Sequence, residues 1–216
     1  MPDLPILWSF RRCPYAMRAR LAIQSSGLQV VLREILLKAK PAPFLAASPK
    51  GTVPVLVDGG TVVEESRDVM LWALRQSDPE GWLEMPEAGY ALIDTCDGPF
   101  KKALDHTKYA VRFPALREAD EREKAMQFLR TLEVRLQITP FLMGHRRTLA
   151  DMAILPFVRQ FAGTDRAWFD AQGLSAVTLW LDDFLASDRF RAVMVKYPPW
   201  QDGQDRVLFP SLTATG

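Results

Sequence analysis

The first third of the chain alternates short apolar runs with a helical pattern. Residues 4–10 and 29–37 are rich in strand-forming side chains, and residues 14–26 place apolar positions at helical spacing among arginines. Pro14 begins this middle segment and Gly27 follows it, which is the usual asymmetry of helix ends. We therefore predict a strand, a helix that begins at Pro14, and a second strand.

The next residues extend this pattern with a short helix, a hairpin and a further helix. Residues 41–47 predict the short helix, and the apolar runs at 53–57 and 61–64 flank the turn sequence Asp58-Gly59-Gly60. Residues 67–76 are again helical. The predicted order is β-α-β-α-β-β-α. Because parallel strands need helical crossovers and the closing hairpin adds an antiparallel strand, this order indicates an α/β thioredoxin-like domain.

The rest of the chain has almost no strand pattern. Helical periodicity predicts an all-α bundle, with helices over residues 87–110, 116–138, 149–162 and 175–186. The stretch after Tyr197 contains proline and glycine and is predicted to be irregular. The two prolines and two glycines of residues 77–89 break both kinds of periodicity. We predict a thioredoxin-like domain over 1–77, a linker over 78–88 and a helical domain over 89–216.

Composition excludes several classes of protein. The chain has 216 residues, of which 48% are hydrophobic and 25% charged, the balance of a globular protein rather than a disordered one. A net charge of +1 gives no basis for nucleic-acid binding. No apolar run reaches the ~18 residues of a membrane span, and the start MPDLPILWSF lacks the pattern of a signal peptide. With only two cysteines, a disulfide scaffold is excluded, and we expect a cytoplasmic location.

Cys13 is the candidate nucleophile. It directly precedes the helix predicted from Pro14, where unpaired backbone N–H groups and the helix dipole favour a negative charge. Three arginines, at positions 11, 12 and 18, lie close to it in sequence. Each factor favours the thiolate, which is the reactive form of cysteine. A buried structural cysteine is the alternative, but the placement between a strand and a proline-initiated helix favours the catalytic role.

The surroundings of Cys13 also exclude a dithiol centre. Ala16 stands where a second cysteine of a redox pair would be, so an external thiol must resolve any mixed disulfide formed at Cys13. Cys96 lies in a helical stretch without basic neighbours, which is typical of a structural cysteine.

Four short motifs follow one another along the chain. They are Cys13-Pro14-Tyr15-Ala16-Met17-Arg18, Ser48-Pro49-Lys50-Gly51-Thr52-Val53-Pro54-Val55-Leu56, Glu65-Ser66, and Thr148-Leu149-Ala150-Asp151-Met152-Ala153-Ile154-Leu155-Pro156. In this order and at these spacings the sequence resembles the cytosolic glutathione S-transferase family, in particular its cysteine-type members, the omega-like classes and their bacterial relatives. The resemblance covers nearly the whole chain. It implies glutathione as co-substrate and no metal.

The resemblance implies a glutathione site in the first domain. In the family, the bond matching Val53–Pro54 is cis, which leaves the Val53 backbone free to pair with the cysteinyl part of the peptide. Tyr15 and Thr52 are further expected members of the site. An ordinary proline at a strand edge is the alternative reading of Pro54.

The two ends of the tripeptide have their own expected partners. The pair matching Glu65 and Ser66 holds the γ-glutamyl end in the family, and Ser66 is also a natural N-cap for the helix that follows. Lys40 falls where omega-like classes carry a lysine that meets the glycyl carboxylate, although Lys38 or Lys50 could take that position. Residues 1–77 hold 10 Lys and Arg against 6 Asp and Glu, a balance that fits a ligand with two carboxylates.

Thr148 and Asp151 form a capping-box variant ahead of an apolar run, and we assign them a structural role at a helix start.

A second substrate is expected to bind between the domains. Its candidate contacts are Tyr109, Arg112, Phe113 and Trp168; the alternative is core packing for the aromatic residues and a solvated position for Arg112. Family members are commonly homodimers, and a monomer is left open.

Three functions are compatible with these features. The first is a glutathione-dependent thiol transferase or reductase that forms a mixed disulfide between Cys13 and glutathione. The second is a transferase that conjugates glutathione to an apolar electrophile, with Tyr15 or Ser9 polarising the glutathione sulfur. The third is a binding protein that keeps the fold without turnover.

Overall fold

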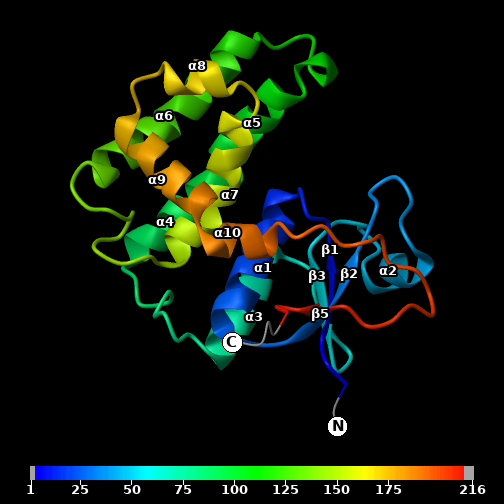
Figure 1. Ribbon diagram of the computed structural model, residues 1–216. Helices are drawn as coiled ribbons and strands as arrows, with labels where there is room; N and C mark the ends of the chain where they lie inside the picture. The colour runs from blue at the N-terminus through cyan, green and yellow to red at the C-terminus, as the bar shows by residue number, and fades with distance from the viewer. Residues whose placement is uncertain (1–2, 212–216) are drawn as a thin grey trace. The chain divides into compact units, whose positions relative to one another are not determined.

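The computed structural model describes residues 3–211, and the chain forms two compact units (Figure 1). The first consists of the residues up to Glu80 together with those from Ser187 onward, and the second runs from Gly81 to Ala186. Residues 187–211, which the sequence analysis assigned to the helical domain, thus belong with the thioredoxin-like part of the chain.

The first unit has the predicted order β-α-β-α-β-β-α, which confirms the thioredoxin-like fold, and it gains a helix and a strand from the C-terminal segment. Its elements are β1 (Ile6–Ser9), α1 (Pro14–Ser26), β2 (Val30–Glu34), α2 (Ala42–Ala47), β3 (Val55–Asp58), β4 (Thr61–Val63), α3 (Ser66–Gln76), α10 (Asp188–Val193) and β5 (Leu208–Phe209).

The sheet has the order β4-β3-β1-β2-β5, with β1 parallel to β2 and antiparallel to β3. The predicted hairpin joins β3 to β4, and Gly59 and Gly60 supply its positive φ angles of 53° and 94°. β5 pairs antiparallel with β2, with Phe209 opposite Val30. The prediction of an irregular tail is therefore wrong at this point. The strand is only two residues long and depends on the edge of β2, so it leaves no pattern of its own in the sequence.

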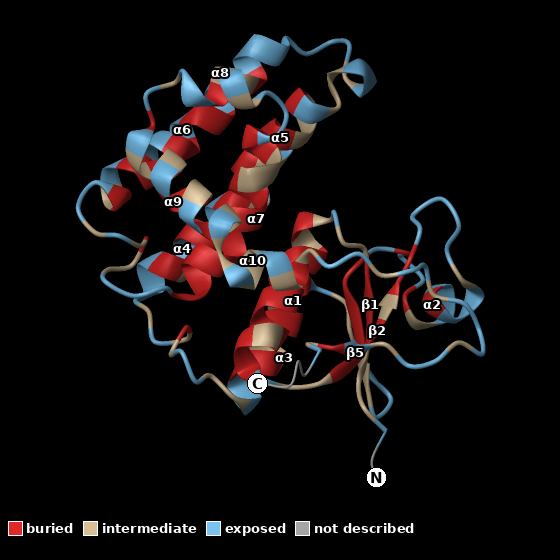
Figure 2. Ribbon diagram, in the orientation of Figure 1, coloured by how far each residue is buried: buried red, intermediate tan, exposed pale blue. Residues whose placement is uncertain are grey.

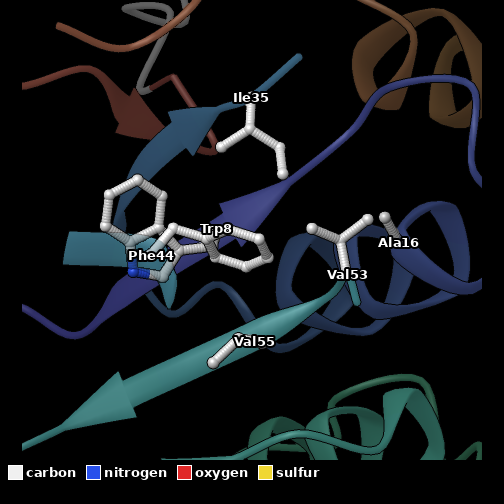
Figure 3. Close-up of a cluster of buried hydrophobic side chains, with 6 residues drawn as sticks. All are labelled: Trp8, Ala16, Ile35, Phe44, Val53 and Val55. Atoms are coloured by element: carbon white, nitrogen blue, oxygen red, sulfur yellow. The ribbon is translucent and has the colours of Figure 1, made fainter. Parts of the chain in front are cut away.

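Both faces of this sheet are covered. α1 and α3 pack side by side on one face, and α2 packs on the other through Phe44, whose ring centroid lies 5.6 Å from that of Trp8 (Figure 1). Trp8 lies in the middle of a buried apolar cluster whose members are Trp8, Ala16, Ile35, Phe44, Val53 and Val55 (Figure 3). α1 is buried along most of its length (Figure 2). This packing fixes the start of α1 against the end of β1.

The second unit is helical, as predicted. Its elements are α4 (Glu87–Thr95), the π-helix η1 (Cys96–Phe100), α5 (Lys101–Lys108), the 3-10 helix η2 (Ala110–Arg112), α6 (Glu118–Leu136), α7 (Leu149–Ala162), α8 (Arg166–Asp170) and α9 (Ser175–Ala186). The helix predicted over 87–110 is interrupted at η1, where Pro99 cannot donate a backbone hydrogen bond. No helix within residues 3–211 combines the length and apolar character needed to cross a membrane.

The capping box predicted at Thr148 and Asp151 is confirmed. The Thr148 backbone N–H donates to the Asp151 carboxylate over 2.9 Å, and the Thr148 hydroxyl donates to it over 3.0 Å. Both residues are buried, and they begin α7, which is buried over nearly its whole length (Figure 2).

Candidate active site

Cys13 lies at the N-cap of α1. β1 ends at Ser9, a tight turn follows in which the Cys13 N–H donates to the Phe10 carbonyl over 3.0 Å, and Pro14 begins the helix. The Cys13 side chain is half-buried, and its Sγ atom lies 3.7 Å from the carbonyl oxygen of Val53. The thiol therefore lies where the first N–H groups of α1 favour negative charge.

A pocket of about 550 Å³ opens beside this thiol, within the size range of small-ligand sites. It is lined by every residue that the sequence analysis expected to contact glutathione, together with four further residues. The expected residues are Cys13, Tyr15, Lys40, Thr52, Val53, Pro54, Glu65 and Ser66, and the further ones are Leu37, Lys50, Gly51 and Glu64. Positions that are far apart in sequence are thus brought together in the first unit.

The Val53–Pro54 peptide bond is cis, as the family resemblance implies. Val53 precedes β3 and is mostly buried, with its carbonyl oxygen beside the Cys13 sulfur. The strand predicted from residue 53 begins two residues later, at Val55.

One end of the pocket is formed by the start of α3. The N-cap of α3 is Glu65, and Ser66 is the first helical residue, so the prediction of Ser66 as N-cap is wrong by one position. The Ser66 hydroxyl instead accepts a hydrogen bond of 3.0 Å from the buried guanidinium of Arg18, which also lies over the Tyr15 ring. Arg18 thus contacts two lining residues. In the sequence, Arg18 was noted only as a basic neighbour of Cys13.

Lysines and carboxylates give the pocket its charge. Of the described lysines considered for the glycyl carboxylate, Lys40 and Lys50 line the pocket and Lys38 does not. The Lys50 ammonium lies 3.4 Å from Glu65 and 3.8 Å from Glu64, at the acidic end of the pocket. Of the three lysines considered from the sequence, Lys40 is therefore the one that lines the pocket without an ion pair to these two carboxylates.

Gly51 gives the Lys40 side chain its room. Gly51 has a φ of 62°, and a Cβ atom there would lie only 3.1 Å from the Lys40 Nζ atom. A larger residue would be strained and would displace the ammonium. Leu37 and Gly51 had no chemical signal in the sequence, because an apolar or glycine residue in a loop shows its role only when the fold places it.

Ser9 does not contribute to the pocket. It is fully buried, and its hydroxyl accepts a hydrogen bond of 2.8 Å from the Arg20 guanidinium. The suggestion that Ser9 polarises a glutathione sulfur is therefore wrong. The Ser9 side chain faces the interior of the unit. Of the two candidates, Ser9 and Tyr15, Tyr15 is the one that lines the pocket.

The residues considered for a second substrate lie in the second unit. Tyr109, Arg112 and Phe113 lie together after α5, with the Arg112 guanidinium 4.5 Å from the centre of the Tyr109 ring. Trp168 belongs to α8, where Arg122 lies 4.8 Å over its ring. Their assignment to substrate binding stays a prediction.

Cys96 is fully buried in η1, in keeping with the structural role expected of it. Within residues 3–211, no group of three or more His, Cys, Asp or Glu side chains is placed to hold a metal ion.

Comparison with known proteins finds similarity to glutathione S-transferases. Residues 7–81 match the family model described as "Glutathione S-transferase, N-terminal domain". The curated Arabidopsis thaliana protein "Glutathione S-transferase DHAR2" is 27% identical over 193 residues, which cover 85% of this chain and 84% of that protein.

Solved structures of glutathione transferases have a similar fold. Glutathione transferase Omega 3C from Trametes versicolor superimposes with a TM-score of 0.76 at 18% identity, covering 92% of each chain. A glutathione transferase family member from Pseudomonas fluorescens, solved with two glutathione molecules bound, gives a TM-score of 0.75 at 19% identity over 90% of this chain and 93% of that one. Residues 7–81 are thus similar to the N-terminal domain of glutathione S-transferases, and the chain shares the fold of these solved glutathione transferases.

Proposed function

We propose that this enzyme is a glutathione-dependent thiol transferase that works through a mixed disulfide at Cys13. One observation carries the proposal. The Cys13 thiol, at the first turn of α1, lines the same pocket as the cis Val53–Pro54 segment and the start of α3. A cysteine in this position acts as a nucleophile toward disulfides, because its thiolate is favoured by the helix N-terminus.

The proposed reaction has two exchanges. The Cys13 thiolate attacks the glutathione sulfur of a glutathionylated thiol, so that the Cys13–glutathione disulfide forms and the substrate sulfur leaves as a thiolate, which takes a proton from water. A second glutathione thiolate then attacks the glutathione sulfur of this mixed disulfide. Oxidised glutathione leaves and the Cys13 thiolate is restored. Ala16, on the next turn, provides no second thiol, so the external glutathione is required.

The charges of the pocket fit a glutathione molecule lying along it. The Val53 backbone would pair with its cysteinyl part, and Ser66 with the first N–H groups of α3 would bind the γ-glutamyl carboxylate. Glu65 would face the γ-glutamyl amine. Lys40 would meet the glycyl carboxylate at the other end.

The test is to incubate the protein with oxidised glutathione and to measure its intact mass. We expect one glutathionyl adduct, which Cys13→Ser abolishes, and at least a hundredfold loss of thiol-transfer rate, as a rough figure for removing a nucleophile. Cys96→Ala is the matched control and should keep both the adduct and the rate, because Cys96 is buried. An adduct that persists in Cys13→Ser would refute the proposal.

Conjugation of glutathione to an apolar electrophile is the second candidate, favoured by the presence of Tyr15 among the residues that line the pocket. A hydroxyl there could hydrogen-bond the glutathione sulfur and keep it ionised. This candidate predicts that Cys13→Ala retains conjugation of a generic electrophile while Tyr15→Phe loses it. The thiol-transferase proposal predicts little conjugation in either variant.

A homodimeric assembly stays a prediction from the family resemblance, and a cytoplasmic location stays a prediction from the cysteine count. Size-exclusion chromatography with light scattering would determine the assembly.

A further inference from the structure

A buried ion pair lies directly behind the candidate active site. Arg20, in the middle of α1, is fully buried, and its guanidinium bonds the carboxylate of Glu34, whose side chain is only 9% exposed at the end of β2. Burial lowers the pKa of Arg20 from its ordinary value, and the Glu34 carboxylate opposes this effect. Because a well-packed apolar pair is often as stable as a buried ion pair, stability alone does not explain this arrangement.

The second oxygen of the Glu34 carboxylate holds the turn in front of Cys13. Glu34 Oε1 accepts the backbone N–H of Arg11 over 2.6 Å, while Oε2 bonds Arg20. Arg11 lies two residues before Cys13 and Arg20 seven residues after it. One carboxylate therefore ties both the turn that leads into α1 and the helix itself to the end of β2.

The C-terminal segment closes this network from the other side. The Arg20 guanidinium donates to the Val193 carbonyl over 3.2 Å, and the Arg11 guanidinium donates to the Met194 carbonyl over 3.3 Å. The Trp200 backbone N–H donates to the Glu34 carbonyl over 2.7 Å. These contacts explain why residues from Ser187 onward belong to the first unit.

We propose that Glu34 and Arg20 are the positioning residues of the Cys13 thiol. Neither lines the pocket, so their effect passes through the backbone. The Glu34 bond to the Arg11 N–H fixes the turn of residues 10–13, and this keeps the thiol at the first N–H groups of α1 and beside the Val53 carbonyl. The use of this thiol in catalysis rests on the proposed function, but its reactivity can be measured without glutathione.

The test compares two double variants that remove the same charges. Arg20→Met/Glu34→Gln keeps an amide oxygen that can accept the Arg11 N–H, whereas Arg20→Met/Glu34→Met has the same length of side chain and no acceptor. Net charge is equal in both, so the comparison isolates this hydrogen bond. The readout is the rate of Cys13 alkylation by iodoacetamide between pH 5 and pH 10, followed by intact mass, on the full chain.

We expect Cys13 to react about tenfold more slowly at pH 7 in Arg20→Met/Glu34→Met than in Arg20→Met/Glu34→Gln. The midpoint of its alkylation rate against pH should lie about one unit higher. Equal rates and midpoints in the two folded variants would overturn the proposal. Glu133→Gln is the control, because Glu133 is a buried carboxylate that accepts the backbone N–H groups of Ala176 and Val177 in the second unit. It should lower stability and leave the alkylation profile unchanged.

A second measurement does not depend on the variants folding. In the unaltered protein, the Arg11 amide should exchange with deuterium at least about tenfold more slowly than an unstructured amide, because it is bonded to a buried carboxylate. Exchange at the unstructured rate would overturn the proposal. If oxidised glutathione forms no adduct while the alkylation difference is present, the proposed function fails and the positioning role stands.

Discussion

Buried carboxylates in the two units make the same kind of bond with different consequences. In the second unit, Asp151 accepts the Thr148 N–H where α7 begins, and Glu133 accepts the N–H groups of Ala176 and Val177 where α9 begins. In the first unit, Glu34 also accepts a backbone N–H, but that N–H belongs to the turn that leads to Cys13. Thr148, Ala176 and Val177 lie at helix starts, whereas Arg11 in the first unit lies just before the candidate nucleophile Cys13.

This difference indicates how a buried carboxylate can be interpreted. Its cost of burial is met in each case by backbone donors and, for Glu34, by a buried guanidinium. The role of each buried carboxylate depends on the segment to which its donors belong, a helix start or the turn before Cys13. We therefore expect changes in the second unit to alter stability, and changes around the pocket of the first unit to alter binding and thiol reactivity.

The largest effect on stability is expected from Asp151→Ala. The Asp151 carboxylate accepts the Leu142 N–H over 3.0 Å and the Trp180 indole N–H over 3.1 Å, in addition to both donors of Thr148. Removing it leaves these donors buried without an acceptor, and we expect a loss of about 3 kcal/mol in the free energy of unfolding, measured in urea. The rate of Cys13 alkylation in the folded variant should not change.

Asp151→Asn is the matched variant. Burial raises the pKa of the Asp151 carboxyl above its ordinary value although its donors oppose this shift, so a neutral side chain with an acceptor oxygen is tolerated there. We expect it to cost about 1 kcal/mol. Equal losses for alanine and asparagine would contradict the capping role, and slower alkylation of Cys13 would contradict the contrast between the units.

The next effect separates the two lysines of the pocket. Lys40→Met should raise the KM for glutathione about tenfold by removing the cation proposed for the glycyl carboxylate. Lys50→Met should change it by less than about threefold, because the exposed pairs of Lys50 with Glu64 and Glu65 are weak. Both should unfold at the urea concentration of the parent. Steady-state kinetics with varied glutathione give the answer, and a larger effect at Lys50 would reverse the assignment.

The first unit could be predicted largely from local patterns. The helix from Pro14 to Ser26 has a proline at its start and Gly27, with a φ of 72°, after its end, so both limits were correct. The same holds for α7, whose capping box is a local feature. β5 was missed because a two-residue strand gains its hydrogen bonds from β2, about 180 residues away in sequence, and no local pattern records such a partner.

The candidate site shows the same division. Cys13, Glu65 and Ser66 carry chemistry that can be recognised in the sequence, and the structure places them around one pocket. The Glu34–Arg20 pair could not be inferred, because each residue alone looks like a solvated charge on a strand or helix. Only the fold turns both side chains inward, where they form an ion pair with each other.

The smallest effect concerns Glu121 in the second unit. Its hydrogen bond with Lys124, more than that with His106, holds the pKa of the Glu121 carboxyl below its ordinary value, while burial opposes the shift. A lowered pKa in the folded state stabilises the protein above the unfolded value of about 4.3 and is lost as pH falls through the folded value. Glu121→Gln should therefore cost up to about 1 kcal/mol at pH 7 and progressively less below pH 4, in urea unfolding series. A cost that does not depend on pH would show that packing, not charge, is what Glu121 contributes.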